Sequence, residues 1–303
     1  MPEKERSDKG KLLTASVTIV FVDKDLPLAT FLAEKLSGTV NKAQGNYYVL
    51  SIYKQSALHY LCKLINGKFR TPKIEALHRL INWLNNKNKF EILKLLPLNN
   101  SDILSNSWLA GFSDSDANFY LSYSIKENAL EYAPSVDHPT RLTGGSKDYG
   151  VGAAENKKIC SSIVLTYRIS QRQEYHRSIS NFSNSYLAVM SSIAAAFNTK
   201  VENISRDRVI SSRNLSYTEK AYLVRVKNKS SRLEIIKYFD NFNLLSSKHL
   251  DFLAWKEANL LVVKRGYRTV EGSSILINLK SSMNTNRTYF NWKHLEDFKK
   301  VIT

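Results

Sequence analysis

The sequence predicts an α+β fold in two similar halves, each of which combines an antiparallel sheet with helices. The first observation behind this prediction is a repeat. From Leu13 and again from Cys160, the apolar patterns run strand, helix, strand, strand, helix, helix. The second is composition, because 43% hydrophobic residues, with 16 Tyr, 13 Phe and 4 Trp, supply a substantial core and exclude wholesale disorder. The third is length, since 303 residues suit two units of about 100–150 residues each.

The first half, residues 13–96, begins with a strand of alternating apolar residues and continues with an amphipathic helix. A strand pair then turns at Gly45, and two further helices follow. The expected elements are a strand at 16–22, a helix at 26–38, a strand pair at 38–53, and helices at 56–67 and 74–85.

The second half, residues 107–262, repeats this order after a leading segment that the first half lacks, SWLAGFSDSDANFYLSYSI. The halves correspond at Lys73 and Lys248, each of which opens the last helix of its half. The pattern is that of a divergent duplication. The repeated elements are strands at 160–170, around 200–213 and at 220–228, and helices at 185–198, 230–242 and 250–261.

The remaining segments show no clear period. Residues 1–12 form a charged start that we expect to be disordered, residues 97–106 a linker broken by Pro97, and residues 263–303 a basic appendix. A long insertion at 126–159 is rich in Gly, Pro, Ser and Lys. A loop of that length is usually functional or disordered, so it either lies along a nucleic-acid backbone or has no fixed structure.

The charge balance predicts a polyanionic partner. Lys and Arg number 44 against 27 Asp and Glu, and the resulting formal charge of +17 is typical of proteins that bind nucleic acid. A basic ribosome-associated protein, or a merely soluble one, is the alternative.

Other composition features exclude several classes of protein. Two cysteines exclude a disulfide framework and a four-thiolate zinc site, and they fit a reducing compartment. No apolar run approaches the roughly 20 residues that span a bilayer. The start carries both signs of charge, unlike a signal or transit peptide, so an organellar protein of this sequence is expected to be made inside the organelle. The six histidines have no paired ligand spacing, and no nucleophile elbow is present.

The sharpest motif is WLAGFSDSDANF at residues 108–119. Asp114 and Asp116 stand where its helix is expected to end, and carboxylates there oppose the helix dipole and so call for a reason. Such hard oxygen ligands suit Mg²⁺, which also takes substrate phosphates. The alternative is an ordinary helix end with two solvated aspartates. The start of the helix offers small residues that let another backbone approach closely: Leu109, Ala110 and Gly111.

This motif resembles that of the LAGLIDADG homing endonucleases, which are encoded in group I introns and some of which act as RNA maturases. The phrases KDLPLATFLAEKLSG, LINGKFRTPKIEALHRLINWLN and LSSKHLDFLAW look like those of members from fungal mitochondrial cox1 introns. The resemblance implies two αββαββα-type halves about a pseudo-twofold axis, with motif helices packed at the centre. It also implies saddle-shaped sheets that lie in the DNA major groove, a monomer, and a mitochondrial location.

The resemblance assigns roles to residues of the second half. Asp116 matches the metal-binding acid, for Mg²⁺ or Mn²⁺, and Asp114 matches the acid that caps or positions. Gln171 matches the residue that orients water, and Lys227 matches the basic residue near the scissile phosphate. Ala117 departs from the glycine that usually follows the motif's acid.

The first half lacks these residues and, with them, the leading motif helix. Val22 and Tyr53 stand where the second half has Gln171 and Lys227, and Asp23 is at best a weak substitute for the missing acid. The nearest acids upstream are Glu3, Glu5 and Asp8. Either the first half has degenerated, or the reading frame begins further upstream.

The predicted strands carry candidate nucleic-acid contacts, because side chains at alternate positions of a two-stranded ribbon meet base edges in the major groove. A solvated strand face is the alternative for any single residue. The candidates are Asn46, Tyr48, Ser51 and Lys54 in the first half, and Arg168, Ser170, Arg172, Arg206, Arg208, Arg213, Arg225 and Lys229 in the second.

Two main functions follow from these patterns. One is a site-specific DNA endonuclease that cuts double-stranded DNA at an intronless allele with Mg²⁺. The other is a non-catalytic maturase that binds a folded group I intron RNA. The intact second motif favours the first, and the stripped first half favours the second. A plain structural nucleic-acid-binding protein is a third possibility.

Overall fold

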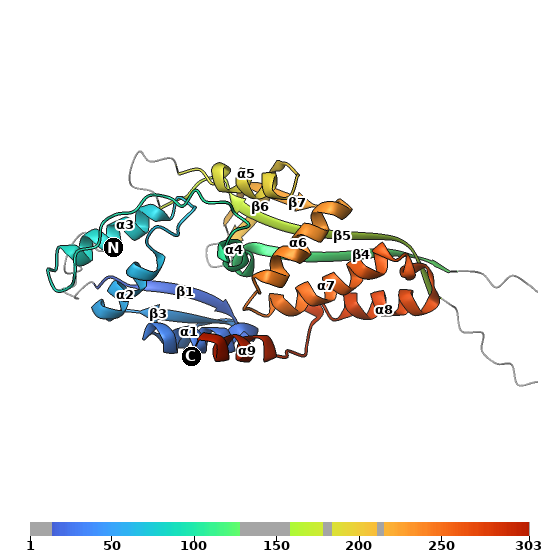
Figure 1. Cartoon of the computed structure of the whole chain (residues 1–303), viewed down its shortest axis with the longest axis horizontal. Helices are drawn as coiled ribbons and strands as arrows, with labels where there is room; N and C mark the ends of the chain where they lie inside the picture. The colour runs from blue at the N-terminus through green and yellow to red at the C-terminus, as the bar shows by residue number, and fades with distance from the viewer. Residues whose placement is uncertain (1–13, 128–157, 178–183, 211–214, 303) are drawn as a thin grey trace, which may run out of the picture.

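The computed structural model describes residues 14–127, 158–177, 184–210 and 215–302 (Figure 1). Its first half follows the predicted order of elements. These are β1 (Val17–Val22), the short 3-10 helix η1 (Asp23–Asp25), α1 (Leu26–Leu36), β2 (Thr39–Lys42), β3 (Tyr47–Ile52), α2 (Gln55–Ile65) and α3 (Ile74–Asn85).

The second half has the same order after a leading helix and strand. The strands of its two hairpins are longer than those of the first half. Its elements are α4 (Trp108–Asp116), β4 (Ala117–Glu127), β5 (Lys158–Arg172), α5 (Leu187–Ala196), β6 (Val201–Ile210), β7 (Leu215–Val226), α6 (Lys229–Asn241) and α7 (Lys248–Val263).

Two antiparallel sheets confirm the predicted fold class. The first has the order β1-β3-β2 and the second the order β4-β5-β7-β6. Val17 pairs with Ile52 at the end of β3, and Tyr167 pairs with Val226 at the end of β7. Ile52 and Val226 each stand three residues before the first residue of the next helix, Gln55 of α2 and Lys229 of α6. Strand β1 therefore corresponds to β5, and Val17 corresponds to Tyr167. Among the described residues nothing takes the place beside β1 that β4 takes beside β5.

The second half holds the larger core. Phe119 of β4 contacts the rings of Tyr167, Phe239, Phe252 and Trp255, with centroids 5.5–5.6 Å apart. The four-stranded sheet therefore buries one face against α6 and α7. In the first half, α1 packs on the sheet. A smaller cluster of fully or nearly fully buried aliphatic residues joins the end of β3 to α2 and α3, among them Ile52, Leu58, Ile81 and Leu84.

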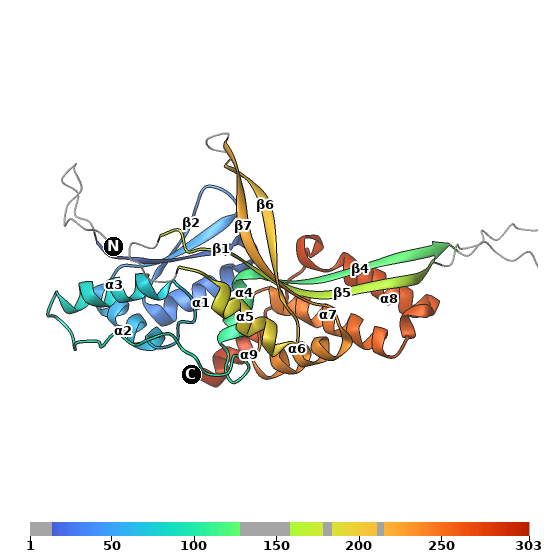
Figure 2. The same cartoon turned by 90° about the horizontal axis from the view of Figure 1, so that it is seen from above.

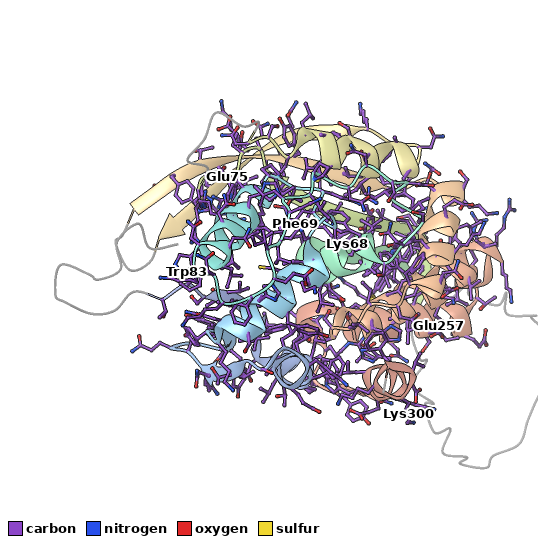
Figure 3. The ribbon with its side chains drawn as sticks, turned by 60° about the vertical axis from the view of Figure 1, so that its left-hand side comes forward. Lys68, Phe69, Glu75, Trp83, Glu257 and Lys300 are labelled. Carbon is purple, nitrogen blue, oxygen red and sulfur yellow. The ribbon has the colours of Figure 1, made fainter. Side chains whose placement is uncertain are left out.

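The segment after α7 joins the two halves. It contains η2 (Gly266–Arg268), α8 (Val270–Ser281), η3 (Asn284–Asn286) and α9 (Lys293–Ile302). Helix α8 packs on α7 and β5, whereas α9 buries Leu295 against Leu28 and Phe31 of α1. Figure 3 shows α9, marked by Lys300, beside α1. The predicted basic appendix is thus a structural tie between the halves.

The connection between the halves is longer than the predicted linker. No helix or strand lies between Asn85 and Trp108. The connection is held to the first half by side chains. The Asn66 amide bonds Lys94 O at 2.7 Å and Leu96 N at 3.2 Å, and Arg70 donates to Ser101.

Seen from above, the strands lie toward one side of the molecule and most helices toward the other (Figure 2). The β6–β7 hairpin rises from this strand side, and the β4–β5 hairpin extends away from the first half. None of the described helices is long and apolar enough to cross a membrane. The predicted insertion at 126–159 falls almost entirely outside the described residues, as do Arg213, Glu3, Glu5, Asp8 and the predicted disordered start.

Candidate functional site

Helix α4 is held in place by buried hydrogen bonds on one side. Ala110 N donates to Tyr238 Oη at 3.1 Å, and the hydroxyls of Ser113 and Tyr167 lie 2.8 Å apart. Leu109 and Ala110 are buried on this side. Gly111 faces the other way and is exposed, and a Cβ placed on it meets no described atom within 4 Å. The three small residues expected to form one packing surface are therefore split between a packed and an open face.

Asp114 positions the start of α7. Its carboxylate accepts hydrogen bonds from Leu245 N at 2.9 Å, from Ser246 N at 3.2 Å and from Ser246 Oγ at 2.5 Å. Burial raises the pKa of this carboxyl, and the three hydrogen bonds oppose that shift because they favour the charged form. Asp114 thus ties the end of α4 to the loop before α7, and its oxygens are engaged there.

Asp116 is the last residue of α4 and keeps its side chain open to solvent. The surrounding protein still withdraws enough water to raise the pKa of its carboxyl. A side-chain hydrogen bond with Gln171 and the charges of Lys73, Lys248 and Arg206 act in the opposite direction. Three elements of the second half, β5, β6 and α7, and the start of α3 in the first half therefore act on this carboxylate.

Two equivalent lysines, one from each half, flank Asp116. Lys248 is half-buried at the start of α7, and its Nζ donates to Ser113 O at 3.1 Å. Desolvation lowers the pKa of Lys248, and the carboxylates of Asp114, Asp116 and Asp25 raise it. The equivalent Lys73 is exposed. The sequence marked both lysines only as signs of the repeat, and their convergence on one acid depends on the packing of the halves.

A buried acid of the first half also reaches the junction. Asp25 accepts a hydrogen bond from Ser247 N at 2.8 Å and so caps α7 of the other half. Asp23, which the sequence offered as a substitute acid, is exposed and lies 3.7 Å from Lys42. Asp25 escaped sequence reasoning because its partner is 222 positions away.

A cleft of about 420 Å³ lies beside these residues. It is bounded by Ile19–Val22 of β1, by Asp25, by the end of α4 and by Ser246–Lys248. Its position matches the unpaired edge of β1. The described part of the first half has no equivalent of α4 and β4. The cleft lies where these two elements would pack beside β1.

The donors present suit a single hydrated cation completed by a substrate. No three His, Cys, Asp or Glu side chains gather as a metal cluster within the described ranges. Asp25 and Asp114 accept hydrogen bonds from backbone N–H groups. Of these three aspartates at the junction, Asp116 is therefore the one available for an ion. Mg²⁺ often takes one or two carboxylates together with waters and phosphate oxygens. The residues fit this arrangement, but they do not form a two-carboxylate pair.

The structure does not bring Lys227 to Asp116. Gln171 pairs with Tyr222, whereas Lys227 follows Val226 at the far end of β7. Five residues of strand correspond to about 17 Å. The same registers place Phe21, not Val22, at the position equivalent to Gln171. The sequence alignment was one residue off there, because strand register cannot be read from spacing alone.

One face of the second sheet is buried under helices, and the other collects the predicted arginines. Side chains alternate along a strand, so those next to the buried Tyr167 and Ile169 point away from the core. We call the opposite side the groove face. It carries Arg168, Ser170 and Arg172 of β5, Arg206 and Arg208 of β6, and Glu219 and Arg225 of β7.

Most groove-face arginines are held by neighbours. Arg225 pairs with Glu202 at 3.2 Å, and the Arg168 guanidinium lies 3.9 Å from the centroid of the Tyr120 ring. Arg172, Arg206 and Arg208 all contact Glu219. Ser170 turns toward the neighbouring strand β7, since its hydroxyl donates to Tyr222 O at 3.0 Å. Lys229 is exposed at the start of α6.

The first-half candidates do not form a comparable surface. Tyr48 and Ser51 lie on opposite faces, and Ser51 is only 5% exposed in the central strand. The Tyr48 ring lies under the Lys42 ammonium at 5.7 Å. Asn46 lies in the turn between β2 and β3, and Lys54 is exposed before α2. These four residues are therefore not brought together.

Known proteins similar to this chain include LAGLIDADG endonucleases and intron-encoded proteins. A family profile described as LAGLIDADG endonuclease matches residues 109–259. The intron-encoded DNA endonuclease aI3 of Saccharomyces cerevisiae is 30% identical over 300 residues, covering 93% of this chain and 65% of that protein. The uncharacterized cox1 intron-2 37.2 kDa protein of Schizosaccharomyces pombe is 24% identical over 261 residues, covering 84% and 63%. The chain thus spans less than two thirds of the length of these relatives.

Solved structures share the fold across both halves. The LAGLIDADG homing endonuclease I-SmaMI, bound to cleaved DNA, has a TM-score of 0.62 at 18% identity, covering 92% of this chain and 89% of that one. I-GzeII in complex with its DNA target has a TM-score of 0.61 at 14% identity, covering 93% of each chain.

Proposed function

The chain belongs to the LAGLIDADG endonuclease family, and we propose that it binds a specific site in double-stranded DNA and hydrolyses one phosphodiester bond there with Mg²⁺. A single observation carries this proposal. Asp116 stands at the junction of the two halves, where Gln171, Lys73 and Lys248 all stabilise the charged form of its carboxyl. A carboxylate surrounded by cations suits a phosphate and a metal ion better than it suits a plain surface position.

The residues around Asp116 have separable roles in this proposal. Asp116 would hold the ion, and a bound Mg²⁺ supplies an activated water and charge stabilisation at the leaving oxygen. Gln171, which stabilises the charged form of Asp116, would orient this carboxylate and the water beside it. Lys73, Lys248 and Arg206 offset the negative charge that develops on the phosphate. Because the pKa of Asp116 is raised, acidification should weaken ion binding at a higher pH than it would at an ordinary aspartate.

Hydrolysis of one strand rather than two follows from the difference between the halves. In the first half, Phe21 stands at the position equivalent to Gln171. The first-half acid at the junction, Asp25, already accepts a hydrogen bond from Ser247 N. The described residues therefore support one hydrolytic centre. The expected product from a supercoiled plasmid is a nicked circle.

The partner and location follow from the relatives. Related proteins are encoded in introns, and one of them is named for a cox1 intron. We therefore infer double-stranded DNA at an intron insertion site as the target, and a mitochondrial location. Both halves lie in one chain, which supports action as a monomer on an asymmetric site.

A role as an RNA maturase is the second candidate. It is favoured by the presence of the groove face beside a junction at which the described residues offer one available carboxylate, Asp116. Binding of a folded intron RNA needs the arginines and no hydrolytic centre. The same face would then serve RNA phosphates.

The direct test is incubation of a supercoiled plasmid carrying the intronless cox1 junction with the protein and Mg²⁺. We expect nicked circles from the wild type and a loss of about 100-fold or more in Asp116→Asn, because removal of a metal ligand costs at least as much as removal of a supporting residue. Asp240→Asn is the matched control, since Asp240 of α6 pairs with Lys256 of α7, away from this site.

Equal cleavage by wild type and Asp116→Asn would contradict the assignment of Asp116. Binding without cleavage by the wild type would contradict the endonuclease proposal and turn attention to splicing of the intron RNA. A splicing assay of the intron RNA with the wild type, Asp116→Asn and Asp240→Asn would then test the maturase role. Equal splicing with all three proteins would support it, because RNA binding does not require the Asp116 charge.

A further inference from the structure

Three arginines on the groove face converge on one buried carboxylate. Arg172 Nη2 lies 2.9 Å from Glu219 Oε1. Arg206 Nη2 lies 3.0 Å from Glu219 Oε2, and Arg208 Nη2 lies 3.3 Å from the same oxygen. Glu219 is 8% exposed, while each arginine side chain keeps 30–49% of its surface open. We call these four residues the Glu219 cluster.

The charges of the Glu219 cluster do not cancel. Three guanidinium groups and one carboxylate leave a net charge of about two positive units in one small area. Each guanidinium has five N–H donors in a fixed plane, and Glu219 engages one or two of them. Without Glu219 the three cations would repel one another and would separate. The Glu219 carboxylate therefore holds the three guanidinium groups together, and several of their N–H donors remain available for another acceptor.

The Glu219 cluster lies beside the candidate hydrolytic site. Arg206 is among the charges that act on Asp116, and Arg172 directly follows Gln171. The cluster joins the end of β5 to the middle and outer part of the β6–β7 hairpin, which rises on the strand side (Figure 2). An open cleft of about 270 Å³ adjoins it, lined in part by Arg172, Tyr217 and Glu219. An anion that extends from Asp116 along the groove face therefore meets the cluster next.

We propose that the Glu219 cluster is a binding site for a backbone phosphate of DNA, next to the phosphate at Asp116, and that Glu219 positions its three arginines. This inference rests on the proposed DNA function. Planar guanidinium forks match phosphate oxygens bidentately, and three around one point suit a phosphate better than a base edge. Because the forks are ordered before binding, less side-chain entropy is lost on association.

The sign of one charge change tests this role. Glu219→Gln raises the positive charge of the face by one unit, and a simple charge account then predicts tighter binding to DNA. Positioning by Glu219 predicts weaker binding, because the arginines separate. We expect about tenfold weaker binding, the equivalent of ordering one or two long side chains.

The measurement is fluorescence anisotropy with a mixed-sequence 24-base-pair duplex over a series of KCl concentrations. Asp207→Asn is the matched control. It removes one negative charge from the same hairpin, but Asp207 bonds Thr218 and lies off the groove face. We expect the control to bind as tightly as the wild type or slightly tighter. Arg206→Gln should reduce the salt slope by about one unit, as loss of one phosphate contact does.

A second variant covers the case in which Glu219→Gln does not fold. The double change Arg206→Lys with Arg208→Lys keeps every charge but removes the planar forks, and the proposal predicts weaker binding there too. Binding by a folded Glu219→Gln that equals or exceeds that of the wild type would overturn the proposal. A wild type that binds no duplex would instead overturn the proposed DNA function.

Discussion

The two halves keep the same frame but differ in what it carries. Strands β1, β3 and β2 correspond to β5, β7 and β6, and Lys73 corresponds to Lys248. Within that frame the second half has Gln171 where the first has Phe21. The core positions have stayed apolar in both halves, whereas the polar positions around the junction have not. Packing and chemistry are therefore separable properties of this fold.

The groove faces show the same contrast. In the second half this face carries five arginines, four of which pair with Glu219 or Glu202. The equivalent face of β1 carries Thr18, Val20 and Val22, and the two valines are 64% and 50% exposed. Exposed valines beside an unpaired strand edge leave a surface that interacts poorly with phosphates. Nucleic-acid affinity should therefore come mainly from the second half.

The equivalent lysines give the largest expected difference in stability. Lys248→Met should lower the free energy of unfolding by about 2–3 kcal/mol, since it removes a half-buried cation that acts on three carboxylates. Lys73→Met should change it by about 0.5 kcal/mol or less, because Lys73 is exposed. Urea denaturation of both variants measures the difference. Equal losses would show that the two lysines carry equal structural weight, contrary to this account.

The histidine pair between α7 and α9 should make stability depend on pH. The His249 and His294 rings stack at 4.2 Å, and burial lowers the pKa of His249 to about 4. In the unfolded chain His249 has its ordinary pKa of about 6.5, so unfolding takes up a proton between these values. We expect about 2 kcal/mol to be lost as pH falls from 6.5 to 4. His249→Phe should show a smaller loss over this range in urea denaturation at each pH, and an unchanged profile would exclude His249 as the cause.

The open face of α4 gives the smallest effect. Gly111→Ala should raise the free energy of unfolding by about 0.5–1 kcal/mol, because alanine favours the helix and its Cβ meets no described atom. Ala110 on the packed face offers the contrast, since Ala110→Leu should destabilise by about 1–3 kcal/mol through overpacking. Thermal unfolding compares the two. A destabilised Gly111→Ala would mean that another segment covers this face.

Much of the fold could be predicted from the sequence because its signals are local. Apolar periodicity located the repeated strands and helices, and the string ending at Asp116 located α4. The parts of the site that could not be predicted depend on non-local geometry. Lys227 follows the last residue of β7 and does not lie near Tyr222, the partner of Gln171, because register decides which strand positions meet. Asp25 was missed because its partner Ser247 belongs to the other half.

The arginines were foreseen as a set but not as an arrangement. Alternation predicted which of them share a face, and the pairing of β5, β6 and β7 confirms that Arg168, Arg172, Arg206, Arg208 and Arg225 do. Glu219 was not singled out, because a single glutamate in a basic strand looks like a solvated residue. Its importance comes from three cross-strand neighbours, which depend on register.

The central claim is that hydrolysis resides in the second half alone. The most direct test labels each strand of the duplex target at its 5′ end and maps the products made with Mg²⁺ by denaturing electrophoresis. This account predicts a single cut on one strand, abolished by Asp116→Asn, with the other strand intact. Cuts on both strands, or a second cut that survives Asp116→Asn, would contradict it.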